Sequence, residues 1–95
     1  MARSTLTPLQ IEILRLFAIE GARASTHYDE KAYTHRTEIR FPVGVHPTVR
    51  TKRPTIQVLR RHRLLQGSDV FGPWTITDRG RAILARIDRG EEYSL

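Results

Sequence analysis

The fold is decided by residues Thr51–Arg63, which read TKRPTIQVLRRHR. A helical repeat of 3.6 residues places Ile56, Val58 and Leu59 on one side of this stretch. Pro54 falls within the first turn, where a helix tolerates a missing backbone N–H. The stretch therefore predicts an amphipathic helix that buries one side in a core and turns the other toward solvent.

The solvent side of this predicted helix is basic. A sector about 100° wide carries arginine and glutamine side chains, which can pair with bases. Its members are Arg53, Gln57, Arg60 and Arg61, and Arg50 and Lys52 come just before the helix. A solvated helix face is the unspecific alternative, since Arg is a good helix former. We favour a binding surface, because acidic residues are missing nearby.

Charge is concentrated around the same helix. Residues 36–63 contain eight Arg and Lys side chains and one acid, Glu38, so this segment has a net charge of +7. The whole 95-residue chain has a net charge of +6, which leaves −1 for the rest. A local positive field attracts polyanions such as nucleic acids. Arg36 and Arg40 are expected to add phosphate contacts if their strand lies beside the helix.

The segment that follows the helix predicts a short hairpin and a last helix. Leu64 and Leu65 begin a strand, and glycines and a proline over residues 67–73 mark turns. Residues 74–77 alternate in polarity like a half-buried strand. Thr77 can then cap a helix that Gly90 ends.

The segment that precedes the basic helix is less regular. Thr7, Pro8 and Gln10 form a capping box at the start of a first helix, which is expected to run to about Glu20 and stop at Gly21. Residues 26–33 could form a short helix. Residues 37–45 alternate as an extended chain, and prolines and a glycine over 42–47 argue against a helix there.

Two stretches resemble parts of a winged helix-turn-helix domain. Thr55–Leu65 is similar to the second half of a recognition helix that runs into the first wing strand. Trp74–Leu84 is similar to the Leu-Thr-x-x-Gly-Arg-x-x-Leu run that closes the wing in bacterial regulators of the MarR and PadR kind. The resemblance implies a fold that is mainly α with a small β-hairpin, with three to four helices and a short wing.

Two features depart from the winged-helix pattern. The second helix of the family should occupy about residues 35–47, and this segment does not look helical. Either that helix has moved upstream to residues 26–33, or a strand and loop replace it. The expected wing tip offers Ser68 and Asp69 and no cation, so a wing contact with phosphate has little support.

The sequence therefore predicts a DNA-binding protein, most simply a transcriptional regulator that inserts helix 51–63 into the major groove. A homodimer is expected, because one small domain covers little DNA, and Ile11, Ile19 and Ile87 could supply the contact. The alternative is a winged-helix module that binds protein or RNA without reading DNA sequence. A small metal-dependent nuclease is a third hypothesis with little support.

Composition excludes several other classes. The chain has no cysteine, so disulfides and thiolate zinc sites are excluded. Its four histidines have no metal-ligand spacing and no catalytic arrangement stands out, so we expect no enzyme, metal or cofactor. Leu16–Ile19 is the longest apolar stretch and is too short for a membrane span, which favours a cytoplasmic protein. Residues 1–95 are expected to form one domain with flexible ends at 1–5 and 91–95.

Overall fold

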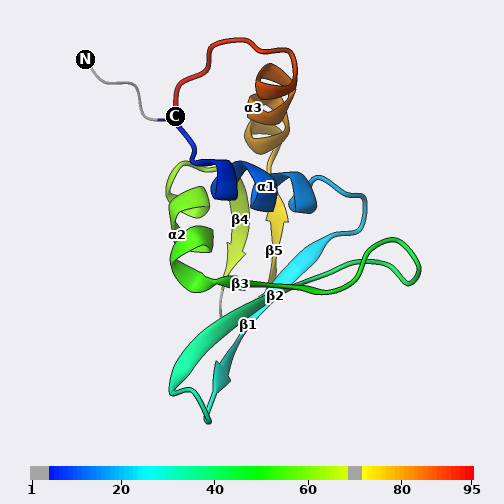
Figure 1. Cartoon of the computed structure of the whole chain (residues 1–95), viewed down its shortest axis with the longest axis vertical. Helices are drawn as coiled ribbons and strands as arrows, with labels where there is room; N and C mark the ends of the chain where they lie inside the picture. Colours follow the sequence, from blue (N-terminus) through cyan, green and yellow to red (C-terminus); the bar gives the residue numbers. More distant parts are fainter. Residues whose placement is uncertain (1–4, 69–71) are drawn as a thin grey trace.

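The computed structural model describes residues 5–68 and 72–95, which contain three helices and five strands (Figure 1). In chain order the elements are α1 (Pro8–Phe17), β1 (Arg23–Asp29), β2 (Thr34–Arg40), β3 (Val49–Lys52), α2 (Arg53–Arg61), β4 (Leu65–Ser68), β5 (Gly72–Ile76) and α3 (Asp78–Asp88). The strands form one antiparallel sheet in the order β3-β2-β1-β5-β4.

The predicted fold class, mainly α with a small β-hairpin in a winged helix-turn-helix, is wrong. The described residues form an α+β fold in which a five-stranded sheet is as prominent as the helices. The error lies in residues 22–47, where β1 and β2 pair over seven residues and no second helix precedes α2. The short helix expected over 26–33 is therefore strand and turn. The residues of β1 on the core side of the sheet are Ala24, Thr26 and Tyr28. Their hydrophobicity is too low for the alternation along β1 to identify a strand from the sequence.

The helices and the hairpin expected elsewhere are confirmed. Thr7 Oγ1 accepts a hydrogen bond from the Gln10 amide at 3.2 Å, and the Gln10 side chain accepts one from the Thr7 amide at 2.9 Å. α1 ends at Phe17, three residues before Glu20. α2 begins at Arg53 because Val49–Lys52 pairs with β2 as an edge strand. β4 and β5 form the expected hairpin.

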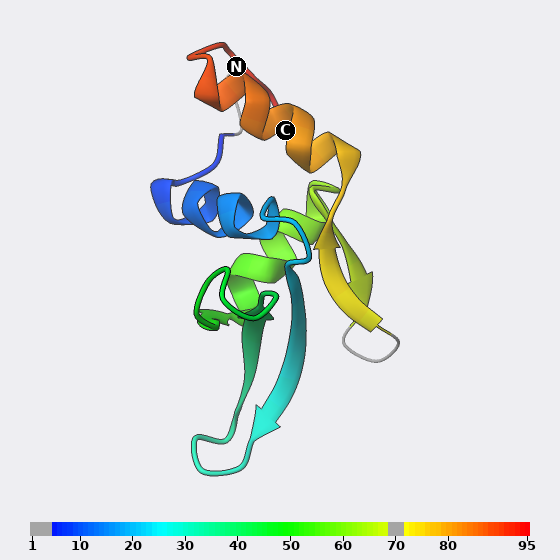
Figure 2. The same cartoon turned by 90° about the vertical axis from the view of Figure 1, so that its right-hand side faces the viewer.

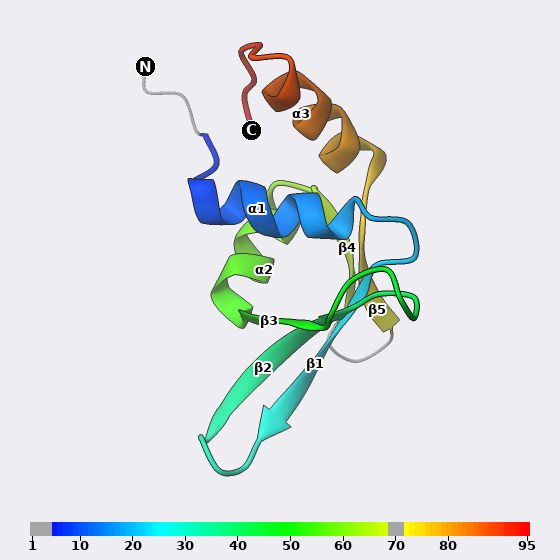
Figure 3. The same ribbon diagram turned by 45° about the vertical axis from the view of Figure 1, so that its right-hand side comes forward.

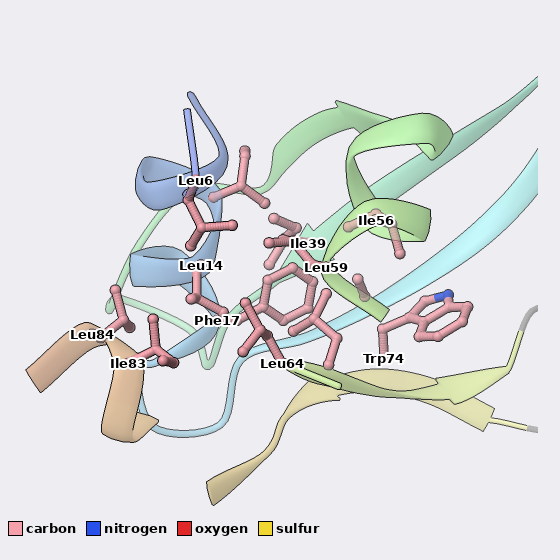
Figure 4. Close-up of a cluster of buried hydrophobic side chains, with 13 residues drawn as sticks. Leu6, Leu14, Phe17, Ile39, Ile56, Leu59, Leu64, Trp74, Ile83 and Leu84 are labelled. Atoms are coloured by element: carbon pink, nitrogen blue, oxygen red, sulfur yellow. The ribbon is translucent and has the colours of Figure 1, made fainter. Parts of the chain in front are cut away.

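The hydrophobic core lies between the helices and one face of the sheet (Figure 4). α1 contributes Leu14 and Phe17, and α2 contributes Ile56 and Leu59. Both pairs belong to the same cluster as Ile39 of β2, which has no exposed surface. The further members of this cluster are Leu6, Ile13, Ala24, Leu64, Leu65, Trp74, Ile83 and Leu84. Consequently α1 and α2 cover one face of β1 and β2 and leave the other face open.

α3 is joined to the hairpin by a close backbone contact at Gly80. Thr77 Oγ1 caps the helix by accepting a hydrogen bond from the Gly80 amide at 3.0 Å, and it donates one to the Arg63 carbonyl at 2.6 Å. A Cβ at position 80 would lie 2.5 Å from the Leu64 carbonyl oxygen. The glycine in the Thr-x-x-Gly run is therefore required by packing.

Both ends of the described chain lie near each other above α1 (Figure 1). The Tyr93 hydroxyl accepts a hydrogen bond from the Leu6 amide at 3.0 Å, and Tyr93 and Leu95 pack against the core. The segment 91–95 thus contacts the body although it has no helix or strand. The chain was also expected to be flexible over residues 1–5, but residues 1–4 lie outside the described part of the chain. Asp69 of the expected wing tip lies outside it too. None of the described helices is long and apolar enough to cross a bilayer.

We predict that Gly80→Ala lowers the free energy of unfolding by about 1–3 kcal/mol, because the methyl group overlaps the Leu64 carbonyl. The expected sign is opposite to that at a solvent-exposed helix position, where replacing Gly by Ala raises the free energy of unfolding by about 1 kcal/mol. Urea denaturation measures the change. The matched control is Ala82→Gly at an exposed position of α3, which should cost about 1 kcal/mol. A Gly80→Ala variant more stable than the parent would contradict the contact.

Candidate nucleic-acid interface

The open face of the sheet carries four of the eight cations in residues 36–63, together with the one acid of that segment, Glu38. Directly opposed residues of antiparallel strands point to the same side. Since Ala24 and Ile39 are paired and point into the core, the neighbouring pairs point outward. Three cross-strand rows result, namely Arg23–Arg40, Ser25–Glu38–Arg50 and His27–Arg36–Lys52. We call these eight residues the outer sheet face.

The outer sheet face contains five Arg and Lys side chains and one carboxylate. Rows lie about 6.6 Å apart along a strand, and adjacent strands lie about 4.8 Å apart. The five cations therefore occupy an area about 13 Å by 10 Å. The next pair along the ladder, Asp29 with Thr34, ends the strands.

Glu38 lies at the centre of this face and is shared by its neighbours. Its carboxylate is 3.3 Å from Arg40 Nη2, 3.5 Å from His27 Nε2 and 3.7 Å from Arg50 Nε. The Arg40 and Arg50 side chains remain 64% and 68% exposed. One carboxylate thus holds two arginines in place and leaves the face positive.

The pKa of Glu38 is lowered from its ordinary value of 4.5. Partial burial alone would raise this pKa, but the hydrogen bond from Arg40 and the charges of His27 and Arg40 outweigh burial. The carboxylate is therefore ionised at neutral pH, and it attracts Arg50 of its own row and Arg40 of the neighbouring row.

The structure divides the predicted DNA-binding residues into two groups. Arg36, Arg40, Arg50 and Lys52 lie together on the outer sheet face. α2 packs on the opposite face of the same strands, so Gln57, Arg60 and Arg61 belong to a different surface. Arg53 lies at the junction, half-buried at the start of α2.

The helix group presents only part of its predicted set of base-reading side chains. The exposed residues of α2 are Pro54, Arg60 and Arg61, whereas Gln57 is half-buried. The Arg60 guanidinium carbon lies 5.7 Å from the centre of the Trp74 ring, where a cation–π contact holds it against β5. The base-reading pair of Arg and Gln expected on this helix is therefore only partly presented.

A hollow of about 640 Å³ lies where β3 leaves the sheet. β3 pairs with β2 only as far as Lys52 opposite Arg36, so Thr34 and His35 continue past its end. The walls come from β2, β3 and the first turn of α2, and are formed by Thr34, His35, Arg36, Arg50, Thr51, Lys52, Arg53 and Pro54. The hollow extends the positive surface from the sheet toward α2.

Sequence reasoning missed Arg23 and His27 as members of the basic surface. Their strand was expected to be irregular or helical, so their side chains had no predicted neighbours. The alternation of Glu38 and Arg40 with Ile39 in the extended segment expected over residues 37–45 was the one available signal, and it placed these two charged side chains on the correct side of β2.

No group of three or more His, Cys, Asp or Glu side chains within residues 5–68 and 72–95 is arranged to hold a metal ion. No family model matches the chain, and no curated protein or solved structure is significantly similar to it.

We predict that Glu38→Gln destabilises the protein at pH 7 and that its difference from the parent shrinks on acidification. Because folding lowers the pKa of Glu38, its stabilising contribution is complete above pH 4.5 and is lost as the pH falls through the folded-state pKa. Urea titrations between pH 7 and pH 3 measure this difference. Arg40→Gln should reproduce part of the effect. A difference that stays the same at both ends of the range would contradict this account of Glu38.

Proposed function

We propose that this protein binds double-stranded DNA and acts in transcription regulation, with the outer sheet face holding the phosphate backbone. One observation carries the proposal: three cross-strand rows bring five cations together around a single carboxylate. Contacts between cations and phosphates supply much of the affinity for DNA and release condensed counterions.

The chemistry of the cations supports a phosphate ligand. Four of the five are arginines, whose planar guanidinium groups match phosphate oxygens with two parallel hydrogen bonds. A face about 13 Å long can meet several phosphates, since phosphates of one strand are spaced about 3.4 Å along the duplex axis. Lys52 and Arg53 continue this surface toward α2.

A homodimer remains part of the proposal, since a second copy doubles the DNA surface covered. Of the residues suggested for the contact, Ile11 and Ile87 are half-buried against the core. Leu9 of α1 is 59% exposed and is a better candidate for an apolar contact between copies. Sedimentation measures the mass in solution, and a monomer at micromolar concentration would contradict this part of the proposal.

A protein-binding module is the second candidate function, and one feature favours it. The turn between β2 and β3 presents Val43 and Val45, and Val43 is fully exposed. Exposed apolar side chains of this kind can contact a protein partner. They are too few to form a large patch, so the charged face is the stronger argument.

We predict that duplex binding weakens steeply with salt and depends on the outer sheet face. Arg50→Ala combined with Lys52→Ala should lower affinity at least about tenfold. It should also reduce the slope of log affinity against log salt by about 1.8, because each lost phosphate contact removes about 0.9. Fluorescence anisotropy with a 30-base-pair duplex at 50–200 mM salt measures both quantities.

Two charge-matched variants complete this experiment. Arg60→Ala with Arg61→Ala should change affinity less, since Arg60 is held against Trp74. Arg86→Ala with Arg89→Ala, at the far end of α3, should leave the slope nearly unchanged. If this control weakens binding as much as the sheet variant, net charge alone explains the binding. No duplex binding at 50 mM salt would favour the protein-binding module.

A further inference from the structure

We propose that the far end of the β1–β2 hairpin enters the major groove of DNA and contacts base edges there. We call residues 27–36 the arm. This inference rests on the proposed function and adds to it the element that reads sequence. It replaces α2, which was expected to enter the groove, with a two-stranded ribbon.

The arm projects away from the rest of the molecule (Figures 1, 2 and 3). Thr37 is completely buried, and its hydroxyl lies 3.1 Å from that of Thr26 on the paired strand. Beyond this pair the described side chains other than the half-buried Arg36 are exposed, among them Tyr28 and His35. The core therefore ends at the two threonines, and the hairpin continues without it.

The dimensions of the arm fit the groove. The turn begins at Glu30, four positions after Thr26, which corresponds to about 13 Å of extended chain. The major groove is about 8.5 Å deep and about 12 Å wide, and it accepts a two-stranded ribbon. The tip can therefore reach base edges while the body stays outside the duplex.

The tip has the chemistry of base contacts and not of phosphate contacts. The turn between the strands presents Glu30, Lys31 and Tyr33, and Tyr33 is 84% exposed. A carboxylate is repelled by phosphates but accepts a hydrogen bond from the cytosine amino group. Lys can donate to guanine O6 and N7. A tip that contacted only the phosphate backbone of DNA would not be expected to carry a carboxylate such as that of Glu30.

Aromatic side chains add a second type of contact on the arm. Tyr28 is 54% exposed, and its ring meets that of His35 edge to face with centroids 5.3 Å apart. This contact fixes the two rings on one side of the ribbon, with the hydroxyl and ring nitrogens available as hydrogen-bonding groups. Arg36, Arg50 and Lys52 lie at the base of the arm, where phosphates on the margins of the groove would meet them.

The test separates sequence reading from phosphate binding. The variant combines Glu30→Ala, Lys31→Ala and Tyr33→Asn, which leaves the net charge unchanged. Asn suits position 33, because Tyr33 has a positive φ of 52°. The control combines Arg89→Ala with Glu91→Ala, an ion pair of equal and opposite charges far from the arm. Parent and variants select from a library of duplexes with 20 random base pairs, and affinity is then measured for the enriched and a scrambled sequence.

We expect the parent to enrich one sequence from the library. In the arm variant the ratio of affinities for the enriched and the scrambled duplex should fall about tenfold or more, because at least one base contact is lost. Affinity for the scrambled duplex and its salt slope should stay the same, and so should the thermal midpoint. An unchanged preference in the arm variant, or binding by the parent without any enrichment, overturns the role of the arm and leaves DNA binding intact. A parallel loss on the scrambled duplex overturns it too, because the tip would then hold phosphates. A parent that binds no duplex overturns the proposed function itself.

Discussion

The alternation of side chains along β2 is the constraint on which the rest of the structure depends. A strand has a repeat of two residues, so successive side chains face opposite sides of the sheet. Ile39 and Thr37 face inward, where Ile39 joins the cluster formed by α1 and α2. Glu38 and Arg40, between and beside them, face outward. A shift of one residue in the pairing would bury the charges and expose the core, so the same pairing fixes the core and the basic face.

This arrangement separates the two properties that the basic helix was expected to combine. α2 was expected to bury one side and bind with the other. In the structure it is a core element, with Ile56 and Leu59 fully buried and Gln57 half-buried. A cluster of basic side chains lies instead on the opposite face of the strands that α2 covers. Side chains of the outer sheet face that do not contact Glu38 can therefore be changed with little effect on the core, because surface substitutions away from packed groups rarely alter stability by more than about 0.5 kcal/mol.

Local signals in the sequence were sufficient to predict the helices and the β4–β5 hairpin. The capping box of Thr7, the cap at Thr77 and the stop at Gly90 depend on residues close in sequence, and each is found at its expected position. The β1–β2 hairpin depends on pairing across the sheet. Its first strand carries small and polar residues on the inward side, and only contact with Ile39 and Trp74 makes Ala24 a core residue. Four members of the outer sheet face were selected from the sequence by their charge alone. That they share one face follows only from the register of three strands, which the sequence did not reveal.

The direct junction between β3 and α2 has a mechanical consequence. β3 ends at Lys52 and α2 begins at Arg53, so no residue between them can act as a hinge. Pro54 further restricts the backbone at this point. A force on the edge strand must be transmitted to α2 and from there to the interior around Phe17 and Ile56. The edge strand and the first turn of α2 are therefore constrained to move together, so a displacement of one displaces the other.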